Sequence, residues 1–90
     1  MKISFTRKSL AKFSKESSKE QMISSIHGVI KYCRHLEKEK LEGKRENGGH
    51  EALTDISQYG GMNQELHDKI KEAIDNPEML YEIIILDVNE

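Results

Sequence analysis

The longest apolar run of the chain lies near its C-terminal end, where four large apolar side chains follow one another directly. It consists of Ile83, Ile84, Ile85 and Leu86, three of which are β-branched. A run of this kind favours a strand that is covered on both faces. Pro77 comes just before it and blocks a helix from entering the run. We therefore predict a strand within residues 79–88.

Alternate residues of a strand face opposite ways. One predicted face of this strand carries Tyr81, Ile83 and Ile85, and the other carries Leu80, Ile84, Leu86 and Val88. A shorter alternation at the N-terminus, with Ile3 and Phe5 on one face, predicts a second strand. With only two strands predicted, we expect a short sheet formed by both ends of the chain. Helices would cover it, and a homodimer could close its open edge.

A long helix is predicted from about Ser18 to about Leu41, because apolar residues recur there at steps of three and four. This stripe consists of Met22, Ile26, Val29, Ile30, Cys33 and Leu36. Either Ser17 with Glu20 or Ser18 with Gln21 fits a capping box at its start. Gly28 interrupts the helix and costs about 1 kcal/mol relative to Ala. It either admits a close neighbour or lies beside empty space.

Shorter helices are predicted on either side of this one. They cover Thr6 to Phe13, Glu51 to Tyr59 and Gln64 to Asp75, and residues 43–50 are predicted to form a loop by composition. The inward stripe of the last helix is Met62, Leu66, Ile70, Ala73 and Ile74. The predicted order is β-α-α-α-α-β, which makes residues 1–90 a single small α+β domain.

Charge is distributed unevenly along the chain. Residues 1–45 carry a formal charge of +7 and residues 46–90 carry −9, although the whole chain has only −2. Such asymmetry is typical of proteins with charged partners, but the two halves could also neutralise each other. A single cysteine, no apolar run of membrane-spanning length and no signal-peptide pattern together predict a cytoplasmic protein.

A row of cations follows one side of the long helix. This basic stripe consists of His27, Lys31, Arg34 and Lys38, and Arg45 extends it into the following loop. Steps of three and four place these side chains on one face, roughly opposite the apolar one. A stripe without matching acids could meet phosphates or an acidic protein surface. A solvated helix face explains it equally well. Only Tyr32 lies near, so stacking on nucleic-acid bases is not expected.

An acidic stripe is predicted on the last helix. It consists of Glu65, Asp68, Glu72 and Asp75. Glu65 and Asp68 are favourable near the helix N-terminus, and Asp75 is unfavourable near the C-terminus. The stripe could dock on a basic partner, where complementary charge would mainly speed association. A solvated face is again the simpler explanation.

No motif in the sequence points to catalysis, a cofactor or a metal. Cys33 and His35 are two positions apart, and such residues do not face each other on a helix. Neither paired glycine, at 48–49 or at 60–61, fits a phosphate-binding pattern. We therefore expect a non-enzymatic protein with no cofactor and no metal site, and Cys33 is expected to be a small core residue.

Three hypotheses for function follow. The first is a protein-binding module that inhibits or modulates a partner through charged helix faces. Small size and strong charge are shared with immunity proteins, antitoxins and phage-encoded inhibitors, which is an analogy of general plan only. The alternative is a nucleic-acid- or nucleotide-binding protein that uses the basic N-terminal half. The third is an assembly subunit whose C-terminal strand completes a partner's sheet.

Overall fold

The computed structural model describes residues 2–6, 18–60 and 64–86. Their elements are β1 (Lys2–Thr6), α2 (Lys19–Leu41), α3 (Gly49–Gly60), α4 (Gln64–Asp75) and β2 (Glu82–Leu86). The predicted mixture of helices with a short sheet from both ends of the chain is confirmed. The additional helix predicted from Thr6 to Phe13 falls on residues 7–17, which lie outside the described residues.

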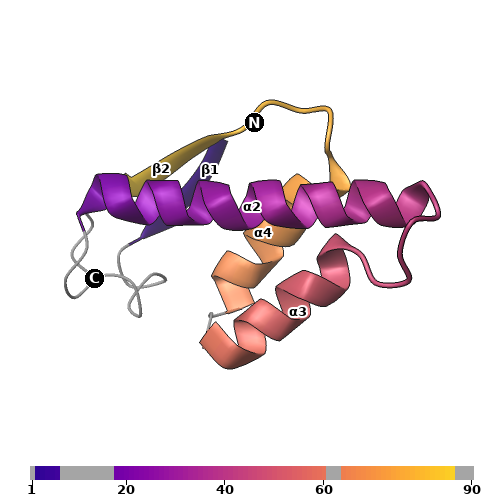
Figure 1. Ribbon diagram of the computed structural model, residues 1–90. Coiled ribbons are helices and arrows are strands. Elements are labelled where there is room, and N and C mark those ends of the chain that lie inside the picture. Colours follow the sequence, from indigo (N-terminus) through magenta and orange to yellow (C-terminus); the bar gives the residue numbers. More distant parts are fainter. Residues whose placement is uncertain (1, 7–17, 61–63, 87–90) are drawn as a thin grey trace.

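The two strands lie side by side and run in the same direction. In their register Ile3 is opposite Ile83 and Phe5 is opposite Ile85. Parallel strands cannot be joined by a tight turn and need a long crossover. The three helices between β1 and β2 supply it (Figure 1). Within the described residues, each strand has one neighbour.

The described helices cover one face of β2. Ile83 and Ile85 on that face are buried, whereas on the other face Ile84 is partly buried and Leu86 is 42% exposed. Coverage of both faces, which the sequence predicts, is not seen among the described residues. The described helices pack against the face of the sheet that carries Ile3 and Phe5. Within the predicted range of 79–88, β2 begins at Glu82 and leaves Leu80 ahead of it, while residues 87 and 88 lie outside the described residues.

Helix α2 lies across the whole molecule (Figure 1). Its start is set by Ser18, whose hydroxyl accepts a hydrogen bond from the Gln21 backbone N–H while the Gln21 side chain accepts one from the Ser18 N–H. Of the two predicted capping boxes, the structure shows the second one. The residues of the predicted apolar stripe are buried, except Val29, which is partly buried beside the core.

The end of α2 is a Schellman motif at Gly43. This glycine has a φ of +76°, which a residue without a Cβ adopts at little cost. Its N–H donates to the Lys40 carbonyl, and the Lys44 N–H donates to the Glu39 carbonyl. Both bonds use carbonyl groups that the helix itself leaves without partners.

Helix α3 begins two residues earlier than predicted, at Gly49. The Gly49 N–H donates to Glu37 Oε1 at 3.0 Å, and the Gly48 N–H donates to Glu51 Oε2 at 3.1 Å. A Cβ on Gly49 would lie 2.1 Å from the Cys33 carbonyl oxygen, so only glycine allows α3 to approach α2 this closely. A glycine-rich segment predicted to be a loop is therefore partly helical, because Glu37 of α2 accepts the Gly49 N–H and Glu51 of α3 accepts the Gly48 N–H.

One core joins the three helices to the sheet. Helix α4 has the predicted bounds, and it buries Leu66, Ile70, Ala73 and Ile74 as its stripe predicts, while Met62 lies outside the described residues. These residues pack with the buried faces of α2, α3 and both strands. Within the described ranges, no helix combines the length and apolar character that crossing a bilayer requires.

Candidate functional site

A groove of about 650 Å³ runs between α2 and the segment that leads from α4 to β2. This segment, residues 76–81, is called the connector below. It arches over the sheet side of α2 (Figure 1). Two hydrogen bonds fix its start: the Asn76 side chain donates to the Glu72 carbonyl at 2.8 Å, and the Met79 N–H donates to the Asn76 carbonyl at 3.1 Å. Pro77 then keeps the chain out of a helix.

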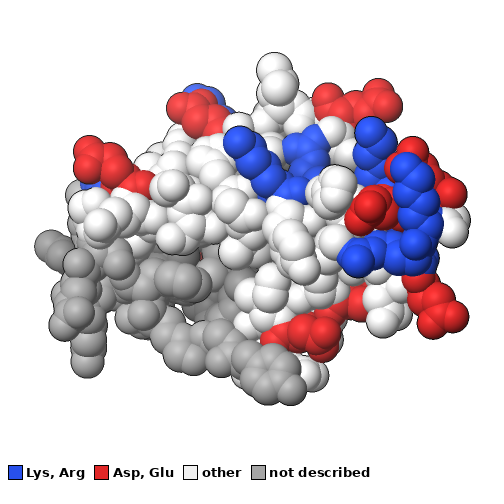
Figure 2. Space-filling model, viewed as in Figure 1, with Lys and Arg blue, Asp and Glu red and all other residues white. Residues whose placement is uncertain are grey.

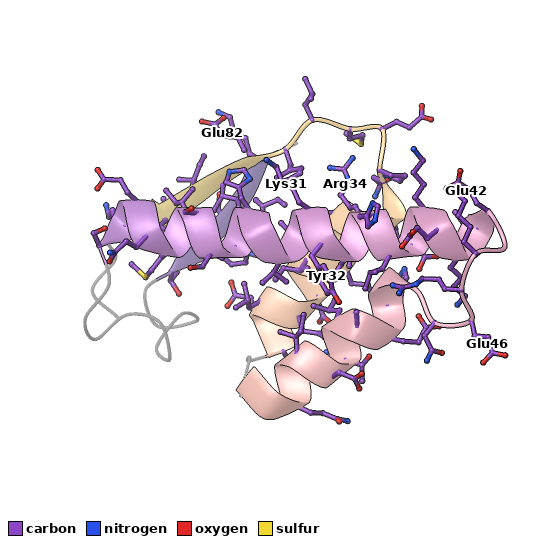
Figure 3. All side chains as sticks on the ribbon, in the orientation of Figure 1. Lys31, Tyr32, Arg34, Glu42, Glu46 and Glu82 are labelled. Carbon is purple, nitrogen blue, oxygen red and sulfur yellow. The ribbon has the colours of Figure 1, made fainter. Side chains whose placement is uncertain are left out.

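The basic stripe supplies one wall of this groove. His27, Lys31 and Arg34 all line it. Figure 3 shows Lys31 and Arg34 on the side of α2 that faces the connector, whereas Tyr32 points to the other side of the helix. Three of the four members of the predicted stripe are thus brought together around one depression.

Tyr81 is the aromatic residue that meets the basic stripe. Its ring lies 5.0 Å from the His27 ring, and the Arg34 guanidinium carbon lies 5.3 Å from its centroid. Burial raises the pKa of Tyr81, and the neighbouring Arg34 partly offsets this, so the phenol stays neutral at physiological pH. The sequence-based choice of Tyr32 as the nearby aromatic is wrong. Tyr81 is 49 positions further along the chain, and only the crossover fold brings it to α2.

The lysines of the basic stripe are not neutralised locally. Neither Lys31 nor Lys38 forms an ion pair with another residue in the described parts of the chain. Glu37 lines a depression with Arg34 and Lys38, and its Oε1 accepts the Gly49 N–H at 3.0 Å. Figure 2 shows Lys and Arg side chains gathered over the C-terminal half of α2 and the turn beyond it, with acidic side chains among them.

Lys38 and Arg45 lie outside the groove. Lys38 lines a neighbouring depression of about 530 Å³ on the other side of Arg34, together with Leu41 and Ile74. Arg45 lies at the α2–α3 turn, where its Nε is 3.8 Å from Glu39 Oε1. The predicted basic site of five residues is therefore split between three places on the surface.

The acidic stripe is largely engaged with neighbouring residues. Glu65 pairs with Lys69 at 3.1 Å, and Asp75 pairs with His50 of α3 at 2.7 Å. Asp68 accepts a hydrogen bond from Gln64 at 2.7 Å. Hydrogen bonding from His67, then from Gln64, lowers the pKa of Asp68.

The fourth member of the acidic stripe, Glu72, lies beside Lys2 and Lys69 at a small depression next to β1. None of the four acidic residues lines the groove.

The groove wall that sequence reasoning missed is the connector. Met79 and Leu80 line the groove, and their side chains are 48% and 90% exposed. The only signal for them was their place between Pro77 and the apolar run, which was interpreted as the beginning of the strand. Exposed large apolar side chains beside uncompensated cations are typical of interaction surfaces.

The described residues contain no group of three or more His, Cys, Asp or Glu side chains that could hold a metal ion. No protein-family model matches this chain, and neither a curated protein nor a solved structure matches it.

Proposed function

We propose that this chain is a non-enzymatic protein-binding module that docks on a partner protein through the groove between α2 and the connector, and thereby inhibits or modulates that partner. One observation carries the proposal: Leu80 exposes 90% of its side chain beside a groove wall that contains Lys31 and Arg34. Many binding surfaces combine an exposed apolar side chain with charged side chains. Here a partner could contact the charge of Lys31 without breaking an ion pair among the described residues.

The groove supports binding better than it supports chemistry. Its wall has two permanent cations, and its only phenol, Tyr81, has a raised pKa and is therefore a poor base near neutral pH. Arg34 is held over the Tyr81 ring, which orients its guanidinium before a partner arrives. A pre-oriented arginine loses little side-chain freedom on binding.

Nucleic acid is the alternative partner, and the distribution of charge disfavours it. Lys40 pairs with Glu51 at 2.6 Å, Lys44 lies 3.7 Å from Glu42, and Arg45 lies beside Glu39. These carboxylates would repel a phosphate backbone along the C-terminal half of α2. The cytoplasmic location, the homodimer and the strand-addition role stay predictions from the sequence.

Affinity capture with matched variants tests the proposal. Tagged wild-type protein, Leu80→Ser and Lys31→Glu are incubated with lysate of the source cells, with and without nuclease. Lys71→Glu serves as the control, because it makes the same charge change on an exposed site of α4 that does not line the groove. We expect a protein that is retained by the wild type and by Lys71→Glu, survives nuclease treatment, and is lost with both groove variants.

Two results would overturn the proposal. If both groove variants retain the same protein as the wild type, the groove is not the binding site. If nuclease removes everything that the wild type captures, the partner is nucleic acid.

A further inference from the structure

The two ends of the groove differ in chemistry. Lys31 and Arg34 occupy one end, three positions apart on one face of α2, so that a single carboxylate could contact both side chains. Ile23 lies at the other end of the same wall, and Met79 and Leu80 add apolar surface from the connector. A ligand that matches both ends needs a negative charge at one position and a large apolar group at another.

The carboxylates that line the groove form no ion pair with Lys31 or Arg34. Glu20 lies eleven positions before Lys31 on α2, which is about 16 Å along a helix and beyond the screening length at physiological salt. Glu78 belongs to the opposite wall and forms no ion pair with Lys31 or Arg34. A carboxylate from outside would therefore meet cations without displacing an existing ion pair. Arginine held in a fixed orientation donates two parallel hydrogen bonds to such a carboxylate.

The spacing of the two ends defines the length of the ligand. Ile23 and Lys31 are eight positions apart, or about 12 Å along the helix. An extended chain covers this distance in about four residues at roughly 3.3 Å each. A helical ligand of the same length would have a diameter of about 10–12 Å and a volume of roughly 1,000 Å³. This exceeds the groove's volume of about 650 Å³, so the extended form fits better.

We propose that the groove binds an extended acidic peptide segment of the partner protein, with a side-chain carboxylate between Lys31 and Arg34 and a large apolar side chain about four residues away against Ile23 and Leu80. This inference rests on the proposed function and specifies the class of ligand. Tyr81 contributes by fixing Arg34 rather than by touching the carboxylate, because its ring carries the guanidinium.

Short synthetic peptides with blocked ends test the inference on the full chain. One probe is acetyl-Leu-Ser-Thr-Ser-Glu-amide, and the second has the reversed order, since the direction of the ligand is open. Matched probes replace Glu by Gln, or Leu by Ser. Binding is followed by amide chemical shifts in ¹⁵N-labelled protein, and dissociation constants in the upper micromolar to millimolar range are expected for so small a ligand.

The expected result is that one peptide order shifts the amides of Ile23, Lys31 and Leu80. Replacing Glu by Gln, or introducing Lys31→Glu, should weaken binding about tenfold or more, which corresponds to about 1.4 kcal/mol. Lys71→Glu should leave the affinity unchanged. Lys38→Glu should have a smaller effect than Lys31→Glu, because Lys38 is about 10 Å further along α2 and its charge is partly screened.

Equal binding of the Gln and Glu peptides would overturn the inference, as would the absence of shifts with either order at millimolar concentration. These outcomes are distinct from failure of the proposed function. If lysate capture yields a protein that depends on Leu80 and Lys31 while neither peptide binds, the groove binds a partner but not through an extended acidic segment.

Discussion

The backbone N–H of Gly49 donates a hydrogen bond to the Glu37 carboxylate at 3.0 Å and thereby fixes the first turn of α3 to the C-terminal part of α2. The contact depends on the absence of a side chain, since a Cβ at Gly49 would lie 2.1 Å from the Cys33 carbonyl oxygen. This carboxylate does not line the groove that contains Lys31, although it shares the neighbouring depression with Arg34 and Lys38. The same bond that sets the helix packing therefore occupies a carboxylate that lies outside the groove.

Replacement of Gly49 by Ala should destabilise the chain. The added methyl group would meet backbone atoms of α2 that cannot move alone, and overpacking of this kind costs about 1–3 kcal/mol. Gly28→Ala is the matched control, because a Cβ there has no described atom within 4 Å. It should stabilise the helix by about 0.5–1 kcal/mol. Urea unfolding of both variants checks the prediction, and equal stabilities would contradict it.

The ion pair between Lys40 and Glu51 should make the free energy of unfolding depend on pH in the acid range. Hydrogen bonding from Lys40, followed by backbone hydrogen bonds, lowers the pKa of Glu51 from 4.5 to about 2. Because the folded-state pKa lies below the unfolded one, the folded state is stabilised at pH values above about 4.5, and this stabilisation is lost as the pH falls towards about 2.

The measurement is urea unfolding of wild type and Glu51→Gln across this pH range. The wild type should be the more stable of the two above pH 4.5, and the difference should disappear near pH 2. A difference that stays constant with pH would show that the carboxylate charge is not responsible. The pKa of Lys40 is raised by the same hydrogen bond, so the pair should also weaken at strongly alkaline pH.

The thiol of Cys33 should react very slowly in the folded protein. Burial raises its pKa from 9.0 to about 11, which reduces the reactive thiolate at pH 8 by about a hundredfold. The side chain is also fully covered by the core. Labelling with a thiol reagent should therefore follow global unfolding, and its rate should rise in step with added urea. Fast labelling of native protein at low urea would contradict this prediction.

Removal of the Lys69 ammonium group should loosen β1. Lys69 Nζ donates a hydrogen bond to the Ser4 carbonyl, pairs with Glu65, and lies 5.1 Å from the centroid of the Phe5 ring. Lys69→Met keeps most of the side-chain volume and should cost about 0.5–1.5 kcal/mol. The control, Lys71→Met, lies at an exposed position of the same helix and should change stability by less than about 0.5 kcal/mol. Thermal unfolding distinguishes them.

Leu80→Ser should separate binding from folding. The Leu80 side chain is 90% exposed, so its replacement should change the free energy of unfolding by less than about 0.5 kcal/mol. If the groove is the docking site, the same variant should weaken partner binding about tenfold or more, because burial of a leucine side chain contributes about 1.5–3 kcal/mol, which serine would largely lose. A large loss of stability would show that Leu80 is instead part of the fold.

The sequence predicted most of the local structure because periodicity and capping are local properties. The steps of three and four in α2 and α4 match their buried faces, and the Ser18 capping box acts between residues three positions apart. The sequence also identified His27, Lys31 and Arg34 as one helix face, since that follows from helix geometry alone. It failed at the start of α3, where the helix is fixed by Glu37 from a different element.

What the sequence alone determined was which residues form helices and strands and which side chains share a face. The tertiary structure decided which faces are covered, and therefore where a site can exist. It buried Ile83 and Ile85 against the described helices, placed Tyr81 beside Arg34 although α3 and α4 lie between them in the chain, and made the connector a groove wall. These outcomes depend on contacts between residues far apart in the chain, and no local pattern of hydrophobic and polar residues encodes such contacts directly.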